Sequence, residues 1–532
     1  MGIYFNPDNE AFANAVNSRI YIDKTGLIDF LNNVVMTEDR CVAVSHARRF
    51  GKSQAARMID AYYSKGSNSA ELFSKFEIAK SPEFKKYLNK YNVIHLDISS
   101  FADFYTDDLT EKITERLYRE FMLECTGKEY EGISYSEPIN LVIAQIYKAS
   151  KTPFVIIIDE WDCIIRNQSG RPDLVHKYLQ FLHSLFKSEE SCGFLALAYV
   201  TGILPIKKIG DESALNNFRE YTMLSSKQLT PYFGFTEDEV KALCEKHGMN
   251  FDSIKNWYDG YLISGQHMYN PNSVYQAMID RSLESYWKNT SAFDTINNYI
   301  TLNFDGLKED TLKMLSGVPV KVDTRGFKND LAVINSRDDA LTALIHLGYL
   351  GYNEERHTAF IPNYEVSTAF QAAISTGNWS KVSETVSACD ELLWATIDGD
   401  AEKVAELVAL AHEAYTSILK YNDENSLSCA VTMAYFTAPA YYNIIREFPT
   451  GKGYADLAFI PRTDSGNKPA MIIELKWNRS ADTAIRQIKE RRYVGRLSGY
   501  GKKILLVGIS YDKDSPDKRH VCTIEPWSDV SK

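Results

Sequence analysis

The stretch S-H-A-R-R-F-G-K-S at residues 45–53 has the residue types of a loop that binds phosphate groups. It follows the apolar run C-V-A-V (41–44) and leads into a helical pattern, so backbone N–H groups at the helix start could surround phosphates. Lys52 would reach the terminal phosphates, and the Ser53 hydroxyl would bind Mg²⁺. His46 stands where such loops open with glycine, which is tolerable if its backbone φ is not positive. The candidate nucleotide contacts are Arg49, Phe50, Gly51, Lys52 and Ser53.

A second set of reactive side chains follows the apolar run F-V-I-I-I (154–158). Asp159 and Glu160 come at the carboxyl end of this expected strand, where open α/β sheets bind their ligands. Asp159 would hold Mg²⁺ through water and Glu160 would polarise the attacking water, although such a pair alone is more often a solvated strand end. Arg48 and Arg49 could touch phosphates or an acidic neighbour, or they could be surface arginines that only keep the loop soluble. Because the loop and the acidic pair occur together, we expect binding of ATP and Mg²⁺. Two alternatives stay open: the site hydrolyses ATP, or the irregular loop is inert.

A third constellation lies in G-Y-A-D-L-A-F-I-P-R-T-D-S-G-N-K-P-A-M-I-I-E-L-K-W (453–477), where two β-like runs flank a turn cluster and predict an antiparallel hairpin. Ser465, midway between Asp456 and Glu474, falls in that turn, so the two carboxylates should lie close across the hairpin. Lys476 comes two residues after Glu474, so both side chains emerge on the same face of the strand. This set fits phosphodiester cleavage, in which both acids bind one or two Mg²⁺ and Lys476 orients or deprotonates the water. E-x-K alone is common in ordinary amphipathic strands, so the assignment depends on Asp456 and the turn length.

The segment from Lys476 to Lys503 is strongly basic, with nine Lys or Arg against two acidic residues and a net charge of +7. The whole chain carries −11, which argues against a protein coated in nucleic acid and confines any such contact to a local patch. A helix is expected over 481–496, and its arginines would neutralise the strand that is cut. The candidate nucleic-acid contacts or supporting residues on this helix are Gln487, Arg486 and Arg491.

Several domains are needed to position these three sets of residues. The 532 residues exceed one ordinary core and predict two to four domains, and 45% hydrophobic with 24% charged residues is typical of a soluble globular protein. No apolar run approaches the roughly 18 residues that span a bilayer, and the start M-G-I-Y-F-N lacks a signal pattern. The eight cysteines have no C-x-x-C spacing. We therefore expect a cytoplasmic protein with reduced thiols, no zinc site and no membrane partner.

Strand-like apolar runs alternate with helical stretches across residues 41–225, which predicts a parallel sheet covered on both faces. Residues 236–290 are helical in pattern, and Thr236 with Glu239 predicts a capping box. A hairpin-like sequence closes the helical segment 291–375 and suggests a winged helix. The expected strands lie at 41–44, 92–98, 154–158 and 194–200, the expected helices at 108–124 and 173–188, and a helix, strand, strand, helix, strand pattern follows from 425.

A series of motifs resembles the AAA-ATPase-like family common in gut and parasitic bacteria. These motifs are Y-I-D-K-T-G (21–26), R-R-F-G-K-S (48–53), I-I-D-E-W-D (157–162), G-I-L-P-I (202–206), L-N-N-F (215–218), Y-F-G-F-T-E-D-E-V (232–240), W-Y-D-G-Y (257–261) and Y-N-P-N-S-V (269–274). The family usually has Arg-Pro where this chain has His46-Ala47. Its members are often fused to a C-terminal nuclease domain of the PD-(D/E)XK superfamily, and G-x-x-D-L…E-L-K-W within 453–477 is similar to such a domain.

The resemblance implies further candidate residues. Sensor residues of such ATPases follow the fourth strand, where Arg219 and Asn216–Asn217 lie, although an ordinary turn fits them equally well. An upstream helix often adds an acidic residue to the nuclease site; Glu424 is best placed, but the Y-H pair that members tend to show nearby is missing. An ATPase of this type can require an arginine from a neighbouring copy, which would make the protein a homo-oligomer.

Together these observations predict an α/β fold class. It comprises a P-loop parallel-sheet domain of the AAA type, a helical lid with a winged helix, and a C-terminal α/β restriction-endonuclease-like domain. The expected boundaries are 1–235, 236–290, 291–378 and, with a helical lead-in, 379–532. We expect a bacterial protein that binds ATP and Mg²⁺ and cleaves nucleic acid, DNA rather than RNA, with cutting gated by nucleotide. The alternative is a nucleotide-dependent switch that binds nucleic acid or a protein through a catalytically silent nuclease-like fold.

Overall fold

The chain forms two compact units in the computed structural model. The first contains Met1–Phe251, Asp259–Ser282 and Lys321–Ala359, and the second contains Asp252–Tyr258, Leu283–Val320 and Phe360–Lys532. None of the helices in the described part of the chain is long and apolar enough to cross a membrane. The structure describes residues 2–102, 107–168, 170–206, 215–287, 292–302, 304, 306–327, 334–376, 388–419, 424–449, 453–462, 465–491, 503–515 and 519–527.

A five-stranded, fully parallel sheet forms the centre of the first unit, as the alternating pattern predicts. Its strands are β1 (Cys41–Ser45), β2 (Asn92–Asp97), β3 (Phe154–Asp159), β4 (Leu195–Gly202) and β5 (Arg219–Thr222), in the order β2-β3-β4-β1-β5. Since the strands are parallel, their carboxyl ends meet at one edge. Only β4 therefore lies between β1, which precedes the phosphate-loop sequence, and β3, which leads into the acidic pair.

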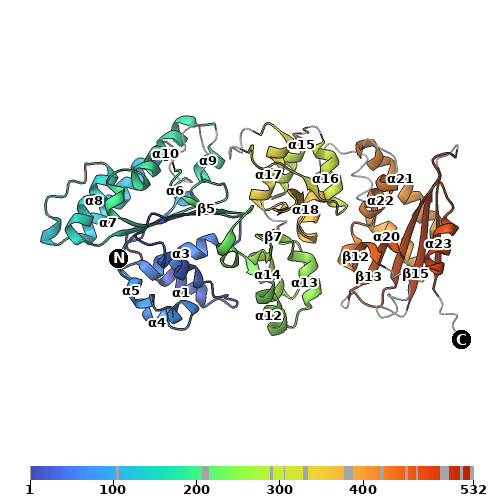
Figure 1. Cartoon of the computed structure of the whole chain (residues 1–532), viewed down its shortest axis with the longest axis horizontal. Coiled ribbons are helices and arrows are strands. Elements are labelled where there is room, and N and C mark those ends of the chain that lie inside the picture. The colour runs from blue at the N-terminus through green and yellow to red at the C-terminus, as the bar shows by residue number, and fades with distance from the viewer. Residues whose placement is uncertain are drawn as a thin grey trace. The chain divides into compact units, whose positions relative to one another are not determined.

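Helices cover both faces of this sheet (Figure 1). One side carries α1 (Glu10–Val16), α2 (Gly26–Asn32), α3 (Lys52–Tyr63), α4 (Ala70–Phe73) and α5 (Phe84–Tyr87). The other carries α6 (Ile98–Ala102), α7 (Leu109–Glu124), α8 (Ile139–Ser150), α9 (Cys163–Asn167), α10 (Pro172–Phe186) and α11 (Ser191–Phe194). The strand side chains alternate between two cores: Val155 and Ile157 pack on the α3 side, and Ile156 and Ile158 pack on the α7 side. This two-sided burial explains the continuous apolar runs in the sequence.

Residues 236–290 contain a small antiparallel sheet in addition to the expected helices. The elements are β6 (Phe235–Thr236), α12 (Glu237–His247), α13 (Phe251–Tyr258), β7 (Tyr261–Ile263), β8 (Gln266–Tyr269) and α14 (Pro271–Asp280), with the sheet order β6-β8-β7. The hairpin turns at Ser264 and Gly265, whose φ values of 48° and 78° fit a two-residue turn that matches strand twist. The capping box is confirmed, because the Thr236 side chain accepts the Glu239 N–H while the Glu239 side chain accepts the Thr236 N–H.

The segment that suggested a winged helix contains helices, a short strand and a hairpin in that general order. Its elements are α15 (Ala292–Thr301), α16 (Leu307–Leu315), β9 (Val320–Lys321), α17 (Arg337–Leu347), β10 (Gly351–Asn353), β11 (Thr358–Phe360) and α18 (Tyr364–Thr376), with the sheet order β10-β11-β9. Lys321–Ala359 groups with the first unit and the flanking residues with the second. The winged-helix assignment and the four domain boundaries therefore stay predictions.

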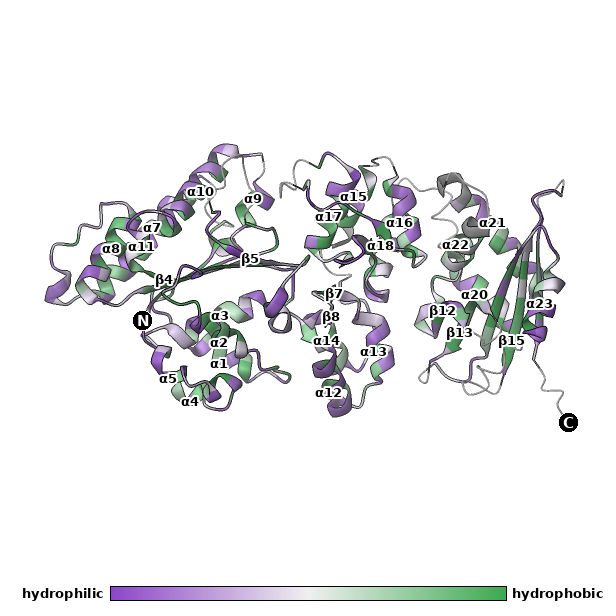
Figure 2. Ribbon diagram, viewed as in Figure 1, coloured by the Kyte–Doolittle hydropathy of each residue, from purple (hydrophilic) through white to green (hydrophobic). Residues whose placement is uncertain are grey.

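A five-stranded mixed sheet dominates the C-terminal part of the second unit (Figure 2). Its strands are β12 (Tyr442–Pro449), β13 (Tyr454–Pro461), β14 (Ala470–Trp477), β15 (Ile504–Tyr511) and β16 (His520–Pro526), in sequential order. Only β14 and β15 pair in parallel, and the chain crosses between them through α23 (Ala481–Glu490). The remaining described helices of this part are α20 (Cys389–Asp398), α21 (Ala401–Leu419) and α22 (Glu424–Ala434). Residues 492–496 of the helix expected over 481–496 lie outside the described residues.

The two faces of this sheet pack against different helices. Ile472 of β14 shares a core with Ile485 and Ile488 of α23. Phe459 of β13 points to the opposite face, where its ring lies 5.1 Å from the ring of Tyr435, just after α22. Because side chains alternate along a strand, the even-numbered residues of β14, which include both predicted reactive residues of that strand, face α23.

Candidate active sites

The phosphate-loop sequence forms a tight loop between β1 and α3. Gly51 caps α3 in the left-handed conformation with φ 88°, and a Cβ at this position would have open space around it. Arg49 also has a positive φ of 70°. The backbone of His46 does not, so this position does not require glycine and a bulky residue fits without strain.

His46 connects the loop to the segment after β5. The buried His46 ring places Nε2 2.6 Å from the hydroxyl of Ser226, and that hydroxyl donates to the carbonyl of Thr222 at 2.8 Å. The hydroxyl proton is therefore used, so His46 donates from Nε2. Burial lowers the pKa of His46 to about 3, and the nearby Lys52 charge acts in the same direction. His46 thus replaces a flexible glycine with a fixed anchor.

Lys52 lies at the bottom of the loop. Its side chain is buried, and Nζ donates to the backbone carbonyl of Ala47 at 3.0 Å. Burial lowers the pKa of Lys52, while the carboxylates of Glu160 and Asp159 oppose this shift. The surrounding pocket of about 390 Å³, called here the phosphate pocket, is lined by Arg48, Arg49, Gly51, Lys52, Ser53, Gln54, Glu160, Phe235, Pro271, Asn272 and Tyr275. The phosphate loop and Glu160 therefore line the same pocket.

The acidic pair lies at the carboxyl end of β3, as expected. Asp159 is buried, and one of its oxygens accepts the Glu160 N–H at 3.0 Å and the hydroxyl of Thr201. Glu160 has a positive φ of 51°, so the chain turns sharply directly after Asp159. Burial raises the pKa of Glu160, and the Lys52 charge works against that shift.

Thr201 is a site residue that sequence reasoning missed. It lies near the end of β4, the strand between β1 and β3, and the only signal was a polar T-G pair after the apolar run 194–200. The suggested sensor residues do not take this place. Arg219 is exposed at the start of β5, 5.9 Å from the Tyr221 ring, and Asn217 donates to the carbonyl of Phe186 at 3.0 Å.

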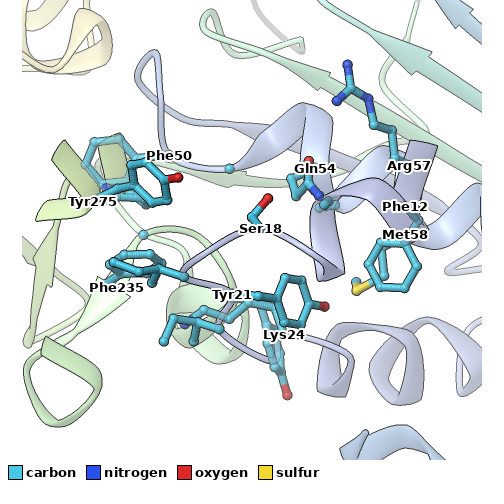
Figure 3. A pocket seen from close by; sticks show the side chains of 18 of the residues that line it. Phe12, Ser18, Tyr21, Lys24, Phe50, Gln54, Arg57, Met58, Phe235 and Tyr275 are labelled. Atoms are coloured by element: carbon cyan, nitrogen blue, oxygen red, sulfur yellow. The ribbon is translucent and has the colours of Figure 1, made fainter. Parts of the chain in front are cut away.

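A second, more apolar pocket of about 500 Å³ shares lining residues with the phosphate pocket. Figure 3 shows this apolar pocket from close by. Phe12, Tyr21, Phe50, Met58, Phe235 and Tyr275 are among its lining residues. Gly51 and Tyr275 line both pockets, so the two are neighbours. Lys24 also lines this pocket, and its Nζ lies 2.7 Å from both carboxylate oxygens of Glu239 and 2.6 Å from the carbonyl of Pro231. The apolar pocket therefore combines side chains that are far apart in the sequence.

The hairpin predicted around Asp456 and Glu474 is present as the antiparallel pair β13–β14. Leu457 pairs with Ile473, so the register places Asp456 opposite Glu474 one step further along. Oδ2 of Asp456 accepts the Leu475 N–H at 2.6 Å, which holds the Asp456 side chain at β14. The register expected from the length of the turn is therefore confirmed.

Lys476 and Gln487 converge on Glu474. Nζ of Lys476 lies 2.8 Å from Oε1 of Glu474, and the side-chain amide of Gln487, from α23, donates to the same oxygen. The other oxygen, Oε2, is buried and has no hydrogen-bond partner among the described residues. Burial raises the pKa of Glu474 to about 7, and the charge of Asp456 adds to the effect. An unpaired carboxylate oxygen beside a second carboxylate fits a divalent cation.

The basic residues of α23 have different surroundings. Arg486 and Arg491 are exposed, and a Cβ at Gly453 would lie 2.9 Å from Nη1 of Arg491. Gln487, on the same helix, donates to the Glu474 carboxylate. Glu424 begins α22, and its side chain lies outside the described residues. The roles expected for Arg486, Arg491 and Glu424 stay predictions.

Comparisons with known proteins agree with both halves of this description. Residues 11–210 match the family model of the predicted AAA-ATPase, and residues 422–520 match that of the PD-(D/E)XK nuclease superfamily. The expected resemblance to an AAA-ATPase-like protein with a C-terminal nuclease-superfamily domain is therefore confirmed. One relative from Azotobacter chroococcum mcd 1, named "Uncharacterized protein in vnfD 5'region", is 21% identical over 526 residues, which cover 93% of each chain.

Proposed function

We propose that this protein binds and hydrolyses ATP in its first unit and cleaves nucleic-acid phosphodiester bonds in its second, with cleavage gated by the nucleotide. The two matched domain families suggest nucleotide binding and nuclease activity in general terms. The observation that carries the proposal is the convergence of Asp456, Glu474 and Lys476 on one sheet face, with a buried Glu474 oxygen that lacks a hydrogen-bond partner among the described residues.

For the nucleotide, the two adjoining pockets supply complementary surroundings. The phosphate pocket offers the backbone at the start of α3 and the Lys52 ammonium to the triphosphate. The apolar pocket would take the base and sugar between aromatic and aliphatic side chains (Figure 3). Ser53 and Asp159 would hold Mg²⁺, with Thr201 orienting the Asp159 carboxylate. Glu160 would polarise the attacking water.

For the nuclease, Asp456 and Glu474 would hold Mg²⁺, which when bound neutralises charge at the scissile phosphate. Lys476 would orient the water or take its proton from the same sheet face. Gln487 would keep Glu474 oriented by holding Oε1 and leaving Oε2 to the cation. Arg486 and Arg491 would contact the nucleic-acid backbone from α23, with DNA preferred over RNA as the substrate.

The deciding experiment compares wild type with Lys476→Ala on linear and circular DNA and on RNA, with and without Mg²⁺ and ATP. We expect Mg²⁺-dependent cleavage by wild type alone, and a change in its rate when ATP is added. Equal cleavage by both proteins would identify a contaminating nuclease and remove the claim. Lys52→Ala serves as the nucleotide control, because it should lose ATP binding and the ATP effect but keep Mg²⁺-dependent cleavage.

The alternative is a nucleotide-dependent switch whose nuclease-like fold binds without cutting. The contact between Lys476 and Glu474 favours this alternative, because the ammonium already neutralises one acid. This alternative predicts ATP-dependent DNA binding by wild type with no cleavage under any metal condition. The comparison of wild type with Lys476→Ala therefore separates the two functions.

A further inference from the structure

Arg166 is a buried side chain that the proposed function does not use. It belongs to α9, which follows the acidic end of β3, and its side chain is only 8% exposed. Nη2 of Arg166 lies 2.5 Å from Oε2 of Glu160, and Nε donates to Oδ2 of Asp162 at 2.9 Å. One guanidinium therefore bridges two carboxylates, and one of them lines the phosphate pocket.

Asp162 fixes this guanidinium to the body of the sheet. Its side chain is fully buried, and Oδ2 also accepts the backbone N–H groups of Ile203 at 3.1 Å and Leu204 at 2.9 Å, directly after β4. A connected path thus runs from the end of β4 through Asp162 and Arg166 to Glu160. Each link is a charge-assisted hydrogen bond, and the planar guanidinium fixes the angle between its two partners.

We infer that Arg166 is a positioning residue for ATP hydrolysis, which aims the Glu160 carboxylate into the phosphate pocket. The inference rests on the proposed hydrolysis of ATP. Glu160 follows the last residue of β3 and has a positive φ of 51°, so it lies at a sharp turn outside the regular strand. Arg166 holds Oε2 of Glu160, while 24% of the Glu160 side chain stays exposed in a residue that lines the pocket.

An ordinary structural ion pair would have the same distances but different consequences. If Arg166 only stabilised the fold, removing its charge would weaken folding and ATP binding together. If it positions Glu160, its removal should slow turnover while the affinity for ATP stays the same. The effect should also disappear in a protein that lacks the Glu160 carboxylate, because residues that act as one unit are not additive.

The test measures steady-state ATP hydrolysis, ATP affinity and thermal melting of the full chain. The variants are Arg166→Gln, Arg166→Lys, Glu160→Gln and the double variant Glu160→Gln/Arg166→Gln. We expect Arg166→Gln to lower kcat by about 10- to 100-fold with KM within about threefold of wild type. Arg166→Lys keeps the charge but cannot bridge both carboxylates in one plane, so its kcat should lie between those of wild type and Arg166→Gln. The double variant should be no slower than Glu160→Gln.

Several results would overturn the inference. One such result is an unchanged or raised kcat in Arg166→Gln. Another is a double variant whose fold-loss in kcat equals the product of the fold-losses in the two single variants. If Arg166→Gln does not fold, an Arg166→Lys protein with wild-type kcat would be sufficient to reject the role. A wild-type protein that binds ATP without turnover would instead reject the proposed hydrolysis, and the positioning role with it.

Discussion

Asp456 and Glu474 lie side by side because Oδ2 of Asp456 accepts the Leu475 N–H across the β13–β14 pair at 2.6 Å. This bond fixes one carboxylate next to another that is itself buried. Two acids in this arrangement repel each other when both are ionised, and burial adds to the unfavourable free energy of the charged state. A bound divalent cation would relieve both effects, so this pair provides the most direct tests of the second site.

Asp456→Asn should remove divalent cations from the second site without unfolding the hairpin. The asparagine keeps an oxygen for the Leu475 N–H but loses the negative charge that attracts the ion. We expect the dissociation constant for Mn²⁺, measured by titration calorimetry, to rise about 10-fold or more. Arg486→Gln is the matched control, which should leave Mn²⁺ affinity unchanged. It should weaken DNA binding and reduce the slope of log binding constant against log salt concentration by about 1. Equal Mn²⁺ affinity in wild type and Asp456→Asn would contradict the assignment.

The raised pKa of Glu474, about 7 against an ordinary value of 4.5, predicts a pH-dependent stability. The folded protein holds this proton more tightly than the unfolded chain. The resulting stabilisation is complete below pH 4.5 and is lost as the pH rises through 7. In EDTA, wild type should therefore lose stability relative to Glu474→Gln between pH 5 and pH 8, by at most about 3 kcal/mol.

Melting temperatures of wild type and Glu474→Gln at four pH values across this window provide the measurement. Added Mg²⁺ should raise the melting temperature of wild type more at pH 8 than at pH 5, because the ion competes with the proton. Parallel curves for the two proteins without metal would show that Glu474 titrates normally.

Replacing His46 by glycine, the residue that usually opens such loops, should weaken this protein rather than improve it. His46→Gly removes the hydrogen bond to Ser226 and leaves a space beside the ring of Phe233, which lies 5.1 Å from the imidazole. We expect a loss of about 2 to 5 kcal/mol, seen as a lower melting temperature. Ser226→Ala removes only the partner and should lose about 1 to 3 kcal/mol. An unchanged melting temperature in His46→Gly would disprove the anchoring role.

Filling the apolar pocket should separate recognition of the nucleoside from recognition of the phosphates. Ala15 lines the apolar pocket but not the phosphate pocket, so Ala15→Trp would occupy the space assigned to base and sugar. We expect the dissociation constant for ATP to rise about 10-fold or more, while that for inorganic tripolyphosphate stays unchanged. Lys52→Ala should weaken binding of both. Equal loss of both ligands in Ala15→Trp would indicate damage to the loop instead of a filled pocket.

Short-range sequence patterns predicted much of this structure. Continuous apolar runs predicted four of the five parallel strands, because strands buried on both faces need apolar side chains at every position. The turn between two β-like runs gave the register of Asp456 and Glu474, since a hairpin fixes pairing from the residue count alone. The hairpin around Ser264 and Gly265 was missed, because three-residue and four-residue strands are too short to show a period of two.

The sequence by itself determined the residue types of both sites, the parallel sheet and the hairpin, because each depends on neighbours along the chain. Only the tertiary structure decided that Thr201 holds Asp159, that Arg166 joins Glu160 to Asp162, and that Gln487 meets Glu474. It also brought Phe12, Phe50 and Tyr275 to one apolar pocket. Such contacts depend on strand order and on how helices pack across a sheet, and neither leaves a periodic signal in the order of the residues.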